Sequence, residues 1–374
     1  MDIQQKLRNL DPSLTGMKKP VKRVSDVHIH IKGTEAETPA GNCFCAVTSY
    51  ARGMLQGDVP IDGFKGVNPA VFEWVGKDPG LKDIDFENVL FVDTETTGLA
   101  GGTGTIPFMV GLGYFTESEF ILEQYFMRDL HEESGLLHAV GERIRNSSAL
   151  VTYNGKAYDF NILSSRFILS RLENPAAGLP HLDLLFTVRR IWRRRLPDCS
   201  LGRVESSLLG FQRFGDVPGY MIPGLYFNYL RTKNAGALKT VFDHNRWDIL
   251  TLAALAGLCG KIYERPEDSL DEPLDLISLG RNFINISRLD LAARCLSKAV
   301  RFDLDDEIRH EALGFLGLVL KRRGEWKRAG SGWDEMCKLM AHSLCPYMEL
   351  AKYYEHRTGD LSRAMKRVDS TIQR

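Results

Sequence analysis

The sequence predicts an α/β domain followed by an all-helical region. Between about residues 86 and 265, short apolar runs bounded by turn residues alternate with segments of helical periodicity, which is typical of a sheet flanked by helices. Beyond residue 272 only helical periodicity remains. A chain of 374 residues is expected to form two domains, or three if its first part folds separately. We therefore expect an N-terminal extension without an assignable role over 1–85, an α/β domain over 86–265 and a helical domain over 272–374.

Within the α/β part, the elements can be placed in order. Apolar runs predict strands at 89–92, 108–115, 120–126 and 150–153, and helical periodicity predicts helices at 132–144, 159–171, 183–195 and 245–263. Because the first three strands follow one another through short connections, the sheet should begin as an antiparallel meander. Residues 27–31 alternate in polarity and predict an edge strand. The charged segment 264–268, which contains a proline, is the expected domain boundary.

Small residues recur at a regular spacing in the helical region. Ala293, Ala329 and Ala364 are separated by 36 and 35 residues, and Gly324 and Gly359 each lie five residues before an alanine. This period predicts paired helices that stack as in tetratricopeptide-like repeats. An ordinary helical bundle is the alternative. Either arrangement would offer a surface to a protein partner.

The composition limits the possible partners and compartments. Lys plus Arg and Asp plus Glu both number 48, so any affinity for nucleic acid must come from a local patch. The seven cysteines are scattered, without the paired spacing of a zinc ribbon, which indicates a reducing compartment. An apolar signal region and an uncharged apolar run of about 18 residues are both missing, so we expect a cytoplasmic protein without a membrane span.

Two acidic residues, Asp93 and Glu95, follow the apolar run 89–92 directly. Alternation along a strand points both carboxylates to the same side of the sheet. Two carboxylates held together on an apolar strand repel each other and lose hydration, which is costly unless a divalent cation lies between them. The pair therefore predicts half of a metal site, and a pair of solvated acids at a strand end is the alternative.

Two later segments supply further candidates for this site. Asp159 lies at the start of a predicted helix, where it could instead be a helix N-cap. His244 and Asp248 are four residues apart and thus share one face of a helix. For these two residues the alternatives are a packed histidine and a solvated acid.

At these residues the sequence resembles the DEDD superfamily of 3′→5′ exonucleases, whose ribonuclease-H-like fold is a mixed sheet flanked by helices. The matching motifs, in chain order, are Asp93-x-Glu95, Asn154-x-x-x-Tyr158-Asp159 and His244-x-x-x-Asp248. Three residues separate the histidine from the aspartate of the third motif. The histidine branch of the superfamily has four there and the tyrosine branch three, so His244 matches the position of that tyrosine.

Four further segments are similar to the bacterial YprB-type ribonuclease-H-like family, which often carries C-terminal tetratricopeptide repeats. They are Thr103-Gly104-Thr105, His181-Leu182-Asp183-Leu184-Leu185, Cys199-Ser200-Leu201 and Asp216-Val217-Pro218-Gly219. The resemblance covers about residues 86–265 strongly, the helical tail loosely and the first 85 residues hardly at all.

The resemblance implies a site for two Mg²⁺ or Mn²⁺ ions, which suit ligands that are all oxygens. In this reading Asp93 bridges both ions. Glu95 and Asp248 complete one side, and Asp159 completes the other. His244 would accept the proton of the attacking water.

Five other residues are candidates for substrate binding. Asn154 would orient the substrate or be a turn residue, and Asp183 would support the site or cap the following helix. Arg189, Arg190 and Arg193 belong to a segment, 189–195, that offers five guanidinium groups and one tryptophan to a nucleic acid strand. A solvated helix face is the alternative for these arginines.

Together these features predict a metal-dependent nuclease, and specifically a 3′→5′ exonuclease on single-stranded DNA or RNA. A nuclease that cuts internally is compatible with the same motifs. The rival in another class is a catalytically idle adaptor that binds nucleic acid or a protein through its helical repeats. Four clustered carboxylates argue against it, because their repulsion lowers stability unless a cation is bound.

Overall fold

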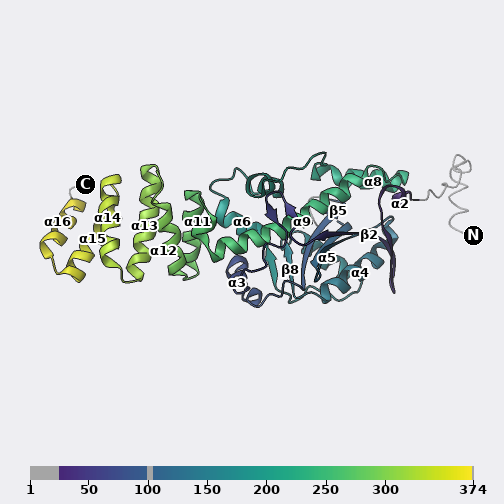
Figure 1. Ribbon diagram of the computed structural model, residues 1–374, viewed down its shortest axis with the longest axis horizontal. Helices are drawn as coiled ribbons and strands as arrows, with labels where there is room; N and C mark the ends of the chain where they lie inside the picture. The colour runs from purple at the N-terminus through teal and green to yellow at the C-terminus, as the bar shows by residue number, and fades with distance from the viewer. Residues whose placement is uncertain (1–24, 99–103, 373–374) are drawn as a thin grey trace, which may run out of the picture.

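The computed structural model describes residues 25–98 and 104–372. These residues form an elongated molecule, with a sheet and its flanking helices at one end and a stack of helices reaching to the other (Figure 1). Residue 103, which begins the Thr103-Gly104-Thr105 segment, lies outside the described residues. The same is true of residues 1–24 of the predicted extension.

One mixed sheet of seven strands has the order β1-β2-β7-β6-β5-β8-β9. The bounds are β1 (Thr34–Thr38), β2 (Gly41–Ala51), β5 (Val89–Thr96), β6 (Pro107–Phe115), β7 (Glu119–Phe126), β8 (Ala149–Thr152) and β9 (His181–Asp183), with β3 (Leu55–Gln56) and β4 (Val59–Pro60) as a separate pair. The five strands from β1 to β5 in this order are antiparallel neighbours, whereas β8 and β9 run parallel to β5. The predicted antiparallel meander is therefore confirmed, and the carboxyl ends of β5, β8 and β9 meet at one edge.

Helices flank this sheet and then continue without strands. In chain order they are α2 (Val27–His30), α3 (Val71–Gly76), α4 (Glu133–Arg145), α5 (Asp159–Leu169), α6 (Leu184–Trp192), α7 (Leu201–Val204), α8 (Ile222–Thr232), α9 (Leu238–Glu264), α10 (Pro266–Ser269), α11 (Pro273–Asn285), α12 (Leu289–Ala299), α13 (Asp306–Arg322), α14 (Trp326–Leu339), α15 (Leu344–Tyr353) and α16 (Leu361–Ile372). The predicted fold class, a mixed sheet flanked by helices and followed by an all-helical region, is confirmed. In the part of the chain that the structure describes, no helix combines the length and apolar character needed to span a bilayer.

The two faces of β5 pack on different clusters of apolar side chains. Val89 and Phe91 belong to the cluster that contains residues of α3, α6 and α9, whereas Leu90 and Val92 belong to the cluster that contains residues of α4 and α5. This division follows from the alternation of side chains along a strand. It orients the polar residues that continue β5 beyond Val92.

The helical tail packs directly on the sheet domain through α11. This helix lies against α6, and the carboxylate of Asp275, which is buried, pairs with the Arg195 guanidinium at 2.9 Å. In the connection between α11 and α12, the Arg288 guanidinium lies 3.9 Å from the centre of the Trp74 ring. Apolar residues of both parts belong to one cluster.

Within the tail, successive helices pack as the pairs α11–α12, α13–α14 and α15–α16, which stack along the long axis of the molecule (Figure 1). Each turn before the second helix of a pair contains a residue with positive φ: Ser287 at 60°, Gly324 at 79° and Gly359 at 70°. This backbone conformation favours glycine. Two of the three turns therefore contain the glycines that the sequence spacing singled out.

The prediction of an edge strand at 27–31 is wrong. Residues Val27–His30 form a short helix, in which the backbone N–H of Ile31 donates to the carbonyl of Val27 at 2.8 Å. Val27 is buried while Ile29 is 81% exposed, so the alternating residues do not share one buried face. Asp26 holds this helix in place, because its carboxylate accepts a hydrogen bond from the backbone N–H of Ala235 at 2.6 Å.

Candidate metal centre

Strand β5 carries Asp93 and Glu95 on the side that faces α9. The strand continues to Thr96 because its last residues pair with β6, so both acids lie within it, beyond the predicted end at residue 92. Their side chains point to the same face of β5 as that of Phe91, which belongs to the apolar cluster that contains residues of α9. The register shifts between Glu95 and Thr96, and such an irregularity re-aims side chains at a strand end.

Two glycines of β6 let α9 approach the sheet closely. Gly111 pairs with Asp93 across the strands, and a Cβ atom added there would overlap the Asn245 side chain. A Cβ at Gly113 would likewise overlap Ile249. The close approach lets the Asn245 amide donate to the Asp93 carboxylate at 2.9 Å. Asn245 is itself fixed by an amide hydrogen bond from Gln124 at 2.9 Å.

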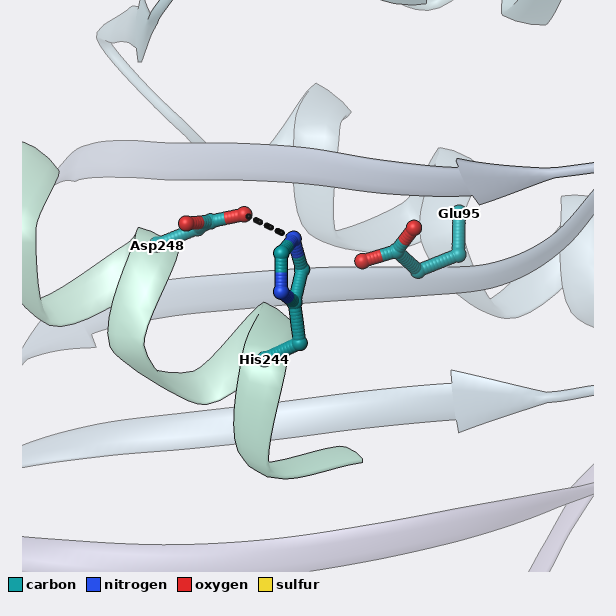
Figure 2. Close-up of side chains that lie close together, drawn as sticks. All are labelled: Glu95, His244 and Asp248. Atoms are coloured by element: carbon teal, nitrogen blue, oxygen red, sulfur yellow. Dashed lines mark ion pairs between the residues drawn. The ribbon is translucent and has the colours of Figure 1, made fainter. Parts of the chain in front are cut away.

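Helix α9 brings Asp248 and His244 to Glu95. One potential ligand atom from each of these three side chains lies within 4.8 Å of the other two. Figure 2 shows the His244 ring between the two carboxylates, with its Nε2 atom 3.4 Å from an Asp248 oxygen. The predicted shared helix face of His244 and Asp248 is therefore confirmed.

Asp159 reaches the same region from the first turn of α5. It is buried, and its carboxylate accepts a hydrogen bond from the Thr94 hydroxyl, which is on the opposite face of β5 from Asp93. Tyr158, which precedes it, makes a 2.9 Å hydrogen bond between its hydroxyl and that of Thr96. The N-cap position is occupied by Tyr158, so Asp159 does not cap the helix.

The acids are close enough to change one another's ionisation. Burial, followed by the charges of Asp248 and Asp159, raises the pKa of Asp93 well above its ordinary range. Burial and then the Asp93 charge raise the pKa of Glu95 in the same direction. Burial also raises the pKa of Asp159 to about 6, although the Thr94 hydrogen bond opposes this. Asp93 and Asp159 thus lie outside the 4.8 Å group but within electrostatic reach of one another.

The donor set fits a hard divalent cation. One oxygen of Glu95, Oε1, is buried and accepts no hydrogen bond from a described residue. An unpartnered buried carboxylate oxygen is costly, and a cation would satisfy it while relieving the repulsion among the acids. The carboxylate oxygens of the site suit Mg²⁺ or Mn²⁺.

An arginine that the sequence analysis missed compensates part of this charge. Arg213 donates to both oxygens of the buried Glu205, at 2.6 and 2.7 Å, and pairs with Asp216 at 3.1 Å. The same guanidinium also pairs with Asp248. A cation bound by Asp248 would therefore compete with Arg213. Asp216 was visible as part of a motif, whereas Glu205 and Arg213 had no sequence signal.

The His244 ring is oriented by Asp216. Its Nδ1 atom lies 2.8 Å from an Asp216 oxygen and 3.4 Å from an Arg213 nitrogen. The shorter contact, to an acceptor, favours the tautomer in which Nδ1–H donates to the carboxylate. This leaves Nε2, on the side of Asp248, free to accept a proton.

The two remaining polar candidates shape the loop before α5. The Asp183 carboxylate accepts three backbone hydrogen bonds, from Leu185 at 3.1 Å, Asn154 at 2.8 Å and Lys156 at 3.1 Å. It therefore caps α6 and also holds the turn that leads to Asp159. Asn154 has a positive φ of 65° and an exposed side chain, as a turn residue does.

The three candidate arginines lie on and just after α6 but in different environments. Arg190 donates to the carbonyls of Phe186 at 3.0 Å and Trp74 at 3.3 Å, so its guanidinium is engaged within the fold. Arg189 and Arg193 are exposed and form no ion pair with a described residue. These two have charge to offer a ligand.

Part of this chain matches a known protein superfamily, and most of it matches a bacterial protein. Residues 90–259, which include Asp93, Asp159 and Asp248, match the RNase_H superfamily. The uncharacterized protein YprB of Bacillus subtilis (strain 168) is 30% identical over 297 residues, which cover 78% of this chain and 70% of YprB. The family B DNA polymerase from the hyperthermophilic archaeon Pyrobaculum calidifontis aligns with a TM-score of 0.35 and 15% identity. That alignment covers 63% of this chain but only 29% of the polymerase.

Proposed function

Since this chain belongs to the same family as YprB, and its residues 90–259 match the RNase_H superfamily, we propose that it is a metal-dependent nuclease acting as a 3′→5′ exonuclease on single-stranded DNA or RNA. The observation that supports this most is the convergence of Asp93, Glu95, Asp159 and Asp248 from β5, α5 and α9. Their burial raises the pKa of the first two, and one Glu95 oxygen has no partner among the described residues. Such a cluster favours cation binding over a merely structural role.

In this proposal Asp93, Glu95, Asp159 and Asp248 would together hold two Mg²⁺ or Mn²⁺ ions. Bound divalent cations would supply Lewis acidity that activates a water and stabilises the charge on the leaving oxygen. Asn245 and Thr94 act as positioning residues, because they hydrogen-bond Asp93 and Asp159 directly.

His244 is proposed as the general base. Asp216 holds the ring so that Nε2 can accept the proton of the attacking water. Nε2 lies 3.4 Å from an Asp248 oxygen, and one ring nitrogen of His244 lies within 4.8 Å of an oxygen of Glu95 and an oxygen of Asp248. We place the protein in the cytoplasm, consistent with its seven free cysteines.

The helical tail is proposed to consist of tetratricopeptide-like repeats that serve a protein partner. Its successive helix pairs and the left-handed turns at Gly324 and Gly359 support this assignment. In this view the sheet domain ends near residue 265 and the repeats begin near 272, as expected from the sequence. The expected extension over 1–85 contributes strands β1 and β2 to the sheet of that domain.

The deciding experiment combines metal binding with hydrolysis. Wild-type protein should bind Mn²⁺ in a calorimetric titration and degrade a 3′-labelled oligonucleotide only when Mn²⁺ is present. Asp93→Asn should lower hydrolysis by about 100-fold or more, since several kcal/mol of transition-state stabilisation are lost. Asp83→Asn, at an exposed position, is the matched control.

Two outcomes would contradict the proposal. Mn²⁺-dependent hydrolysis that persists in Asp93→Asn would remove the site assignment. A wild type that neither binds Mn²⁺ nor hydrolyses any strand would favour the idle adaptor. An oligonucleotide with a blocked 3′ end tests the direction, because a 3′→5′ exonuclease cannot degrade it.

A further inference from the structure

A cationic cavity lies where the helical tail meets the sheet domain. It has a volume of about 470 Å³ and is formed by α6, the residues that follow it, the end of α3 and α11. Its six cationic lining residues are Lys77, Arg189, Arg190, Arg193, Arg194 and Arg281. None of the described residues that line it is acidic. The chain has equal numbers of acidic and basic residues, so this cluster of positive charge is a local feature. Either a bound anion or ion pairs within the protein should balance it.

Ion pairing within the protein explains only part of this cluster. Arg194 pairs with Glu311 at 2.9 Å, and Arg190 donates to the carbonyls of Trp74 and Val75 near the end of α3. Arg189, Arg193 and Arg281 form no ion pair with a described residue and are exposed to solvent. Like charges held together without counter-charges destabilise the fold. Three guanidinium groups therefore remain available to an anion.

The geometry of the cavity is held in place by both domains. Lys77, which lines the cavity, is the C-cap of α3 and has a left-handed conformation with φ of 53°. Arg281 lies over the Phe315 ring at 5.8 Å. The buried pair of Arg195 with Asp275 fixes α11 against α6. The spacing between Arg281 on one side and Arg189 and Arg193 on the other is thus built into the fold.

The cavity lies on the same element that begins beside the candidate metal centre. Asp183 caps α6 at the sheet edge where β5 and β8 end, and Arg189 follows six residues later, roughly 9 Å along the helix axis. Arg189 is also near enough to Tyr153 to oppose the burial that raises the pKa of its hydroxyl. Tyr153 directly precedes the turn that leads to Asp159. A strand leaving the acids along α6 would meet these arginines.

We infer that this cavity, lined by Arg189, Arg193 and Arg281, binds phosphates of a single nucleic acid strand whose end lies at the metal centre. The inference rests on the proposed function and extends it, because it makes the first helix of the tail part of the substrate-binding surface. Arginine suits this role, since its planar guanidinium donates two parallel hydrogen bonds to a phosphate. The sequence-independent contact matches an enzyme that moves along a strand.

The test measures strand binding by the full chain without added metal, so that no hydrolysis interferes. The triple variant Arg189→Ala, Arg193→Ala, Arg281→Ala is compared with wild type by fluorescence anisotropy, using a labelled single-stranded DNA of about 20 nucleotides. A control triple variant, Arg145→Ala, Arg322→Ala, Lys366→Ala, removes the same charge from exposed positions on three other helices. Circular dichroism checks that both variants fold.

The inference expects the cavity variant to bind at least about tenfold more weakly than wild type, and the control variant to bind like wild type. In the cavity variant the slope of log affinity against log salt concentration should be smaller in magnitude by about 2, because three phosphate contacts are lost at about 0.7 each. Equal affinity and equal salt dependence for the cavity variant and wild type would overturn it. So would equal losses in both triple variants, which would show a general charge effect.

The proposed function is tested separately, on wild type alone, by Mn²⁺-dependent hydrolysis of bis(p-nitrophenyl) phosphate, a substrate too small to span the cavity. Hydrolysis together with unchanged strand binding in the cavity variant would refute the cavity and retain the nuclease. If the cavity variant loses strand binding but wild type hydrolyses nothing, the nuclease proposal is refuted and the cavity inference is retained.

Discussion

Replacing Asp159 with asparagine should stabilise the protein when metal is absent. Asp159 is 5% exposed, and burial raises the pKa of its carboxyl from 3.8 to about 6. Because the folded state holds this proton more tightly than the unfolded state, stability falls as the pH rises from about 3.8 to about 6 and stays lowered above that. A difference of about 2 pH units at about 1.4 kcal/mol each corresponds to about 3 kcal/mol.

Asparagine cannot ionise, so the variant escapes this destabilisation, while its side-chain oxygen can still accept the Thr94 hydrogen bond. In EDTA at about pH 8, Asp159→Asn should increase the free energy of unfolding by about 3 kcal/mol, and by about half of that at about pH 5. Urea unfolding followed by tryptophan fluorescence measures this, because Trp192 lies in the core. Asp83→Asn, at an exposed position, should change stability little at either pH.

Mn²⁺ should reverse the order of stability, because the wild type gains a cation that neutralises the carboxylate and the variant does not. The reasoning is refuted if metal-free Asp159→Asn is no more stable than wild type at about pH 8. It is also refuted if the difference between the two proteins does not change with pH.

Two further substitutions test the network around the acids. Arg213→Gln should lower the metal-free free energy of unfolding by about 3 kcal/mol, because the buried Glu205 loses its partner. The same variant should bind Mn²⁺ about tenfold more tightly in calorimetry, since Asp248 no longer pairs with a competing guanidinium, and weaker binding would contradict this. Asp183→Ala should lower the free energy of unfolding by about 3 kcal/mol, because three backbone N–H groups lose their acceptor. Its Mn²⁺ titration should keep the wild-type stoichiometry, and a lost metal site in a stable variant would assign Asp183 to the centre instead.

Much of the fold was predictable because its signals are local. The apolar runs that became β5, β6, β7 and β8 were each placed within a few residues. The first strand was underestimated, since Asp93 and Glu95 read as residues beyond a strand whereas pairing with β6 extends it. The alternation of polarity at 27–31 led to a wrong prediction. Asp26, which precedes the helix, accepts a hydrogen bond from Ala235, more than 200 positions away, and such a contact cannot be read from local polarity.

The sequence predicted the acids and the histidine of the site, but it did not predict Asn245, Glu205 or Arg213. Asp93, Glu95, Asp159 and Asp248 carry distinctive spacings, but Asn245 lies beside a motif without belonging to it. The partners of Arg213 come from a π-helical turn, Glu205–Leu209, from a loop and from α9, and no spacing rule links these segments.

The arrangement of side chains along one strand or one helix is a property of the local backbone. For this reason the residue order alone was enough to put Asp93 with Glu95, and His244 with Asp248, on common faces. Which charges meet across the molecule depends instead on how strands order and helices pack. Only the packing of α9 over Gly111 joined Asn245 to Asp93, and only the packing of α11 on α6 formed a cavity lined by arginines from both domains.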